Sequence, residues 1–138
     1  MIVADTCIIV HLFNNTELTS RAQQVLEINS DWYCPTTWRE EYANVLAKLY
    51  KKSKYRPENV LTLFQTTSEQ LLNRECKIRT KDALECAMQY QISVYDAHFI
   101  VLAEQLNTWL ITEDIEVLKK CPKRALSMLD FISHSSRL

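Results

Sequence analysis

The chain has 138 residues and a formal net charge of −1, with 47% hydrophobic and 24% charged residues, a composition typical of a folded globular protein. Glycine is absent, which excludes a glycine-rich dinucleotide-binding turn and a Walker A phosphate loop, because both need that residue. The small net charge gives no general attraction to nucleic acid, so any such binding must depend on local groups.

The cysteines indicate a reducing compartment. There are five, an odd number, and none is spaced as CxxC, so neither a disulfide framework nor a zinc site is expected. The sequence starts MIVAD, without the basic region of a signal peptide, and no apolar run reaches the length of a membrane span. We therefore expect a single cytoplasmic domain over residues 1–138 that makes no membrane contact.

The first half of the sequence predicts two strands and three helices. A buried strand at 1–4 is followed by an apolar segment at 7–13, a helix at 17–28, a strand at 32–34, and helices at 37–52 and 57–67. Thr37-Trp38-Arg39-Glu40 fits a capping box at the start of the helix at 37–52, which assigns Glu40 to capping. The last two helices are expected to pair as a hairpin.

The second half alternates strands and helices. Strands are predicted at 71–78, 109–111 and 125–132, helices at 80–90, 93–105 and 115–120, and a polar tail at 134–138. Alternation of this kind is typical of an α/β fold, in which helices cover both faces of a parallel sheet.

The stretch from Ser93 to Asp114 carries a carboxylate at each end. At about 100° per residue, Ile100 and Ala103 lie on the same helix face as Asp96, whereas His98 lies on the far, polar side. Asp96 therefore belongs to an apolar face, where a bare carboxylate is costly to bury. Asp114 follows the predicted strand WLI, at the edge of an open α/β sheet where ligands bind.

Two further acids have comparable positions. Asp5 ends the first strand, and Glu41 lies on the flank of its helix, about 80° from the centre of the apolar face. Each acid also has a structural interpretation: Asp5 and Asp114 as helix N-caps, Asp96 in a capping box with Ser93, and Glu41 paired with a lysine. Those interpretations do not predict that the acids meet at one edge. Clustered carboxylates are ligands suited to Mg²⁺ or Mn²⁺.

Four motifs give the sequence its family resemblance: VADTC at 3–7, EYANVL at 41–46, YDAHFIVLAEQL at 95–106 and LITED at 110–114. In their order and spacing they resemble the PIN-domain ribonucleases, and among these the VapC-type toxins of prokaryotic toxin–antitoxin pairs. The resemblance extends over nearly the whole chain. It implies a three-layer α/β/α sandwich with a mainly parallel central sheet of four to five strands.

By this resemblance, one or two Mg²⁺ or Mn²⁺ ions are bound by Asp5, Glu41, Asp96 and Asp114, with Glu116 as a weaker additional candidate. Thr112 and Thr6 correspond to hydroxyl residues beside the last and the first acid. The departures from the family pattern are the lack of glycine and Cys7, which stands where a small polar residue is usual. Neither removes an acid.

The implied function is a Mg²⁺-dependent endoribonuclease, the toxin of a type II toxin–antitoxin pair with a small antitoxin partner. A PIN nuclease of RNA processing and a non-catalytic PIN-like binding module are the alternatives. A phospho-receiver would need a second acid beside Asp5, and the sequence has none there.

Two binding surfaces complete the predictions. A basic run near the end of the helix at 37–52 is expected to contact RNA phosphates through Lys51, Lys52, Lys54 and Arg56. A homodimer is expected through apolar residues of the first two helices and of the hairpin at 37–67, with Tyr50, Tyr55 and Phe64 as aromatic candidates.

Overall fold

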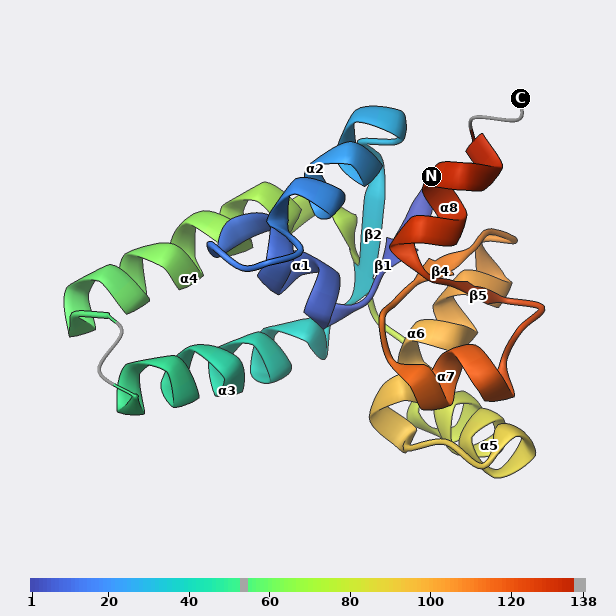
Figure 1. Ribbon diagram of the computed structural model, residues 1–138. Coiled ribbons are helices and arrows are strands. Elements are labelled where there is room, and N and C mark those ends of the chain that lie inside the picture. Colours follow the sequence, from blue (N-terminus) through green and yellow to red (C-terminus); the bar gives the residue numbers. More distant parts are fainter. Residues whose placement is uncertain (53–54, 136–138) are drawn as a thin grey trace.

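The structure is a computed structural model that describes residues 1–52 and 55–135. Its centre is a parallel sheet with the strand order β3-β2-β1-β4-β5, and β1 (Ile2–Ala4) lies in the middle (Figure 1). On one side of β1 are β2 (Trp32–Pro35) and β3 (Glu75–Cys76). On the other side are β4 (Leu110–Ile111) and β5 (Ala125–Leu126). The predicted α/β fold with a parallel sheet is confirmed.

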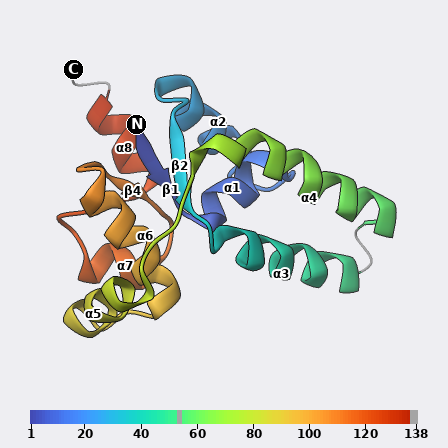
Figure 2. The same ribbon diagram turned by 180° about the vertical axis from the view of Figure 1, so that it is seen from behind.

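The helices form a layer on each face of the sheet. The chain moves outward from β1 to β3 through α1 (Thr6–Phe13), α2 (Thr19–Ile28), α3 (Trp38–Lys51) and α4 (Pro57–Leu71). It then returns through α5 (Thr80–Tyr90) and α6 (Val94–Gln105) to β4, and through α7 (Ile115–Lys120) to β5. Because parallel crossovers are right-handed, the two directions of travel place these groups on opposite faces. Both views show α1–α4 on one side of β1 and β2, with α5 and α6 on the other (Figures 1 and 2).

The interior is one continuous cluster of buried apolar side chains between these layers. Helix α6 lies deepest, because it packs on β1 and β2 while α5 covers its outer side. All residues from Ala97 to Ala103 are buried, including His98, whose Nδ1 atom is 2.7 Å from the Val94 carbonyl oxygen. The expectation that His98 lies on a polar face is therefore wrong. This helix is covered on both sides and has no polar face over that stretch.

Two predicted strands are much shorter than expected, because helix takes up part of each. The strand expected at 71–78 pairs with β2 only at Glu75–Cys76, because α4 continues to Leu71 and a 3₁₀ turn covers Leu72–Arg74. The strand expected at 125–132 ends at Leu126, where its two-residue partner β4 also ends. Helix α8 (Met128–Ser135) follows and packs on α2, so the expected polar tail is helical as far as Ser135.

The lack of glycine leaves two strained backbone positions. Gln91 after α5 and Asn107 after α6 have φ angles of 58° and 49°, in the left-handed region that glycine usually occupies at helix ends. The predicted capping box of α3 is wrong, because the Thr37 side chain accepts no cap hydrogen bond. Among the described residues, no helix is long and apolar enough to span a bilayer.

Candidate active site

Four predicted acids lie in one cleft at the carboxyl ends of the strands. Asp5 directly follows β1, Glu41 lies in the first turn of α3 after β2, Asp96 lies in the first turn of α6, and Asp114 lies between β4 and α7. Because the strands are parallel, α1, α3 and α7, which follow β1, β2 and β4, start at the same edge of the sheet. Helix α6, which leads back into β4, also starts there. The cleft has a volume of about 430 Å³. This acidic cleft is lined by Asp5, Thr6, Cys7, Glu41, Asn44, Val45, Asp96, Glu113 and Asp114.

Asp5 is buried and is the most firmly held of these carboxylates. Its Oδ1 accepts a hydrogen bond from the Thr6 amide at 2.7 Å, and its Oδ2 accepts one from the Thr112 hydroxyl at 2.6 Å. The same Thr112 oxygen accepts a hydrogen bond from the Asp114 amide at 3.0 Å. Thr112 therefore joins the acid after β1 to the acid after β4, at the point in the sheet where the strand order reverses.

The N-cap interpretations of Asp5 and Asp114 are confirmed, and they are compatible with a place in the cleft. Asp5 caps α1, and Asp114 Oδ1 accepts hydrogen bonds from the Glu116 and Val117 amides at 2.9 and 3.2 Å. Glu41 and Asp96 lie in first turns, where the helix dipole favours negative charge. For Asp96, the Ser93 hydroxyl caps α6 by accepting from the Asp96 amide at 3.0 Å. Helix N-termini thus help to hold four carboxylates in one place.

The negative charges of these carboxylates repel one another. Burial raises the pKa of Asp5 to about 6, and the Asp96 charge adds to that rise. Burial followed by the charges of Asp5 and Asp96 raises the pKa of Glu41 to about 7. The pKa of Asp96 is also raised, by burial and by the charge of Asp114. Mutual repulsion of this kind is relieved by a cation placed between the carboxylates.

Two oxygen atoms in the cleft have unused hydrogen-bonding capacity. Glu41 Oε1 and Thr6 Oγ1 are buried, and neither has a hydrogen-bond partner of regular geometry. The Thr6 hydroxyl is nevertheless near enough to Glu41 to offset part of the rise in its pKa. A buried oxygen without a partner costs free energy unless another group satisfies it. The donor set consists of hard carboxylate and hydroxyl oxygens, which fits a magnesium or manganese ion. Among the described residues, no three acidic, histidine or cysteine side chains already stand close enough to enclose an ion.

Other predicted residues lie outside the acidic cleft. Glu116 is an exposed residue of α7, and its carboxylate pairs with Lys120 at 3.0 Å. Lys51 and Lys52 are exposed at the far end of α3, and Arg56 is exposed just before α4. Lys51 comes ten positions after Glu41, which corresponds to roughly 15 Å along the helix. Lys54 lies outside the described residues.

The cleft also contains residues that the sequence did not single out as site residues. Asn44 is three residues after Glu41, and this spacing could have identified it, because residues three apart lie on one helix face. Glu113 is next to Asp114, and its Oε1 accepts a hydrogen bond from the Met128 amide at 3.1 Å. Cys7 Sγ donates a long hydrogen bond of 3.7 Å to Asp5 Oδ2, and burial raises the pKa of its thiol.

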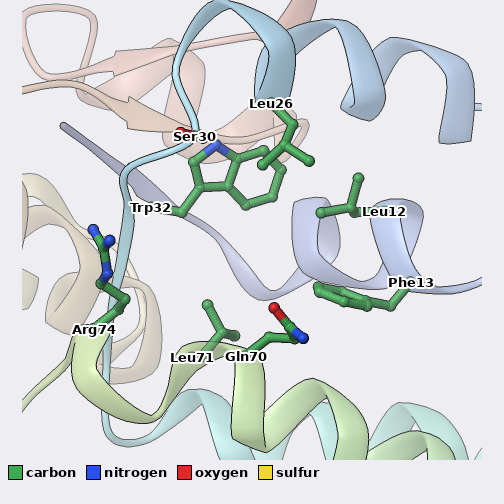
Figure 3. Close-up of a pocket in the computed structure, with 8 residues that line it drawn as sticks. All are labelled: Leu12, Phe13, Leu26, Ser30, Trp32, Gln70, Leu71 and Arg74. Carbon is green, nitrogen blue, oxygen red and sulfur yellow. The ribbon is translucent and has the colours of Figure 1, made fainter.

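A second cavity lies at the opposite end of β2 and carries no acid (Figure 3). It has a volume of about 390 Å³, and its walls come from α1, α2, β2, the end of α4 and the turn after it. This apolar cavity is lined by Leu12, Phe13, Leu26, Ser30, Trp32, Gln70, Leu71 and Arg74. No carboxylate, histidine or cysteine is among these lining residues, so the acidic cleft is the candidate active site.

Comparison with solved structures identifies proteins of the same fold. Protein PAE2754 from Pyrobaculum aerophilum has a TM-score of 0.76 and 15% identity, with 99% of this chain and 97% of that chain covered. A toxin–antitoxin complex from Klebsiella pneumoniae includes a chain with a TM-score of 0.69 and 18% identity, with 93% and 98% covered. FitAcB from Neisseria gonorrhoeae has a TM-score of 0.69 and 17% identity, with 94% and 99% covered.

Sequence comparison agrees with the fold. No curated protein matches the sequence. The family model of the PIN domain, however, matches residues 2–123, which include β1 through α7 and all four predicted acids. This match covers most of the chain, and the chain belongs to the PIN domain family.

Proposed function

We propose that this protein is a Mg²⁺-dependent endoribonuclease and the toxin of a type II toxin–antitoxin pair. The observation that carries the proposal is the single cleft in which Asp5, Glu41, Asp96 and Asp114 meet. Burial and neighbouring negative charges raise the pKa of Asp5, Glu41 and Asp96 there. PIN domains are in general nucleases, and this cleft has the hard oxygen donors that such an activity needs.

The roles of the residues follow from their contacts. The four carboxylates would hold one or two Mg²⁺ or Mn²⁺ ions, and the ions would bind the scissile phosphate and lower the pKa of the attacking water. Thr112 keeps Asp5 oriented through its 2.6 Å hydrogen bond, so Thr112 is a positioning residue. The buried Oε1 of Glu41 and the Thr6 hydroxyl offer further oxygen atoms toward the cleft.

The test is cleavage of a labelled single-stranded RNA by the purified protein. We expect cleavage in Mg²⁺ or Mn²⁺, none in EDTA, and recovery when the metal is returned. Cleavage that persists in EDTA would contradict the proposed role of the acids. Analysis of product ends should show 5′-phosphate and 3′-hydroxyl groups.

The toxin role implies a small protein partner. Its support is the fold shared with a chain of the Klebsiella pneumoniae toxin–antitoxin complex and with VapBC2 from Rickettsia felis, at a TM-score of 0.57 and 17% identity. The five cysteines, all unpaired, fit a cytoplasmic setting. Co-expression with the product of the neighbouring reading frame should give a stable complex that no longer cleaves RNA. A neighbouring product that neither binds nor inhibits would favour a role in RNA processing.

We further propose a homodimer through α1, α2 and the α3–α4 hairpin. Tyr50 is exposed on the hairpin, whereas Phe64 is half-buried and stacks on Tyr42 with ring centroids 6.1 Å apart. Tyr50 is therefore the better candidate for a contact with a second copy. Sedimentation at micromolar concentration should give a dimer, and a protein that is only monomeric there would contradict this surface.

A further inference from the structure

Tyr95 is an exposed aromatic residue at the start of an otherwise buried helix. Its exposed fraction is 65%, although it lies one residue before Asp96 and two before the buried stretch Ala97–Ala103. Within the described ranges, its ring stacks on no other ring and its hydroxyl forms no hydrogen bond. The packing of the fold therefore does not account for an aromatic side chain at this position.

The space around Tyr95 continues the acidic cleft. A second hollow, of about 480 Å³, is lined by Glu40, Glu41, Asn44, Ser93, Tyr95 and Asp96. Glu41, Asn44 and Asp96 line both spaces, so one groove runs from Asp5 past Asp96 to the Tyr95 ring. A nucleic-acid strand whose phosphate is at the acids would place a neighbouring nucleotide in this second hollow.

The composition of the groove limits how it can hold a strand. No lysine or arginine is among the described residues that line either space. Besides a metal, the walls offer carboxylates, small polar groups and one aromatic face. An exposed aromatic ring binds an unpaired base by stacking, and stacking tolerates any sequence because every base has a π-face.

We propose that Tyr95 binds the substrate strand by stacking on the nucleobase next to the scissile phosphate. This inference rests on the proposed nuclease function and adds a substrate-binding residue to that site. A base in a duplex is already stacked on both sides and cannot offer its face to Tyr95. Tyr95 is thus a substrate-binding residue, and its contribution is made when the strand binds.

The test uses a labelled ten-nucleotide single-stranded RNA and a matched strand whose nucleotides lack bases. Binding is measured by fluorescence anisotropy with Ca²⁺ in place of Mg²⁺, and gel analysis confirms that the strand stays intact. Tyr95→Ala should weaken binding of the base-bearing strand roughly 5- to 150-fold, the scale of one lost base–aromatic stack. Tyr95→Phe should restore binding, because the ring is kept. The abasic strand should bind wild-type protein and Tyr95→Ala equally.

Met88→Ala is the matched control, because Met88 on α5 is equally exposed at 66% and does not line the groove. In cleavage assays with Mg²⁺, Tyr95→Ala should raise KM and leave kcat nearly unchanged, as expected for a loss of binding alone.

Two results would overturn the inference: unchanged affinity of Tyr95→Ala for the base-bearing strand, or equal weakening for both strands. If wild-type protein cleaves RNA while either result is obtained, only the role of Tyr95 fails. If wild-type protein neither binds nor cleaves the strand, the proposed function fails with it.

Discussion

The acidic cleft and the apolar cavity are of similar volume, about 430 and 390 Å³, and lie toward opposite ends of the same parallel sheet. At the carboxyl ends, helices begin, and their N-termini hold charged groups such as Asp5 and Asp114. At the start of β2, Trp32 and Leu71 face the other space, where apolar side chains dominate (Figure 3). In the acidic cleft, burial and mutual repulsion of the carboxylates lower the stability of the fold. Around the apolar cavity, the burial of apolar side chains contributes stability.

The largest expected effect is the loss of cleavage in Asp96→Asn. Removing one metal-binding carboxylate should lower the cleavage rate by at least about 10²- to 10³-fold, the scale of losing one group that stabilises transition-state charge. The melting temperature without metal should be equal or higher, because one repelling charge has gone. Cleavage assays and thermal melts in EDTA and in Mg²⁺ measure both quantities.

Glu27→Gln on α2 is the control for Asp96→Asn, since it removes an exposed carboxylate outside the cleft. It should keep full activity. A destabilised but fully active Asp96→Asn protein would show that Asp96 only stabilises the first turn of α6 and takes no part in cleavage.

The apolar cavity should behave in the opposite way. Leu71→Ala removes a buried side chain, 5% exposed, and should lower the free energy of unfolding by about 2–3 kcal/mol, near the lower end for such truncations because the site already adjoins a cavity. The kcat of the remaining folded protein should not change. Denaturant unfolding and cleavage well below the melting temperature check this. A loss of kcat in a fully folded sample would mean that the two ends of the sheet are coupled.

A smaller effect is expected in the pH dependence of stability, which the acids of the cleft should change and the apolar cavity should not. The pKa of Glu41 is raised from 4.5 to about 7, so its contribution to folding is most favourable below pH 4.5 and is lost as the pH rises through 7. Metal-free wild-type protein should therefore lose stability relative to Glu41→Gln over this interval. The difference should be about 1–2 kcal/mol after allowance for partial exposure to water.

Urea unfolding in EDTA at pH 4.5 and pH 7.5 measures this difference for both proteins. Magnesium should stabilise the wild-type protein more at pH 7.5, because the carboxylates must be ionised to bind it. If the two proteins differ equally at both pH values, Glu41 does not titrate in this interval.

The smallest effect on cleavage at saturating RNA is expected from the basic run at the far end of α3. Neutralising Lys51, Lys52, Lys54 and Arg56 should weaken RNA binding and reduce the slope of log affinity against log salt by about 3, given about 0.7 per phosphate contact with a single strand. Filter binding at several salt concentrations measures the slope. An unchanged slope would mean that the cleft binds RNA without help from these cations.

Much of the architecture was predictable because its signals are local. The short buried strands at β1, β2 and β4 and the helices between them follow from runs and periods of apolar residues. The failures lie where local signals compete. The run from Ala125 to Ile132 has enough apolar residues for a strand, but Met128 and Phe131 are buried at helical spacing, and the Ser127 hydroxyl accepts from the Asp130 amide at 3.1 Å.

The sequence by itself identified the four acids Asp5, Glu41, Asp96 and Asp114 that line the acidic cleft. An acid that follows a buried strand, such as Asp5, must lie at the carboxyl edge of a parallel sheet, because the direction of the chain fixes which edge it reaches. Helix periodicity likewise placed Glu41 and Asp96 beside that edge, and all four acids line one cleft.

Only the tertiary structure decided how these side chains interact. The hydrogen bond from Thr112 to Asp5 joins residues 107 positions apart, and the negative charges that add to the rise in the pKa of Glu41 belong to Asp5 and Asp96, which are distant in the chain. His98 is buried because α5 covers the outer side of α6, and Glu113 contacts Met128 because α8 begins beside it. Contacts of this kind depend on which elements become neighbours, and a local pattern of residues does not contain that information.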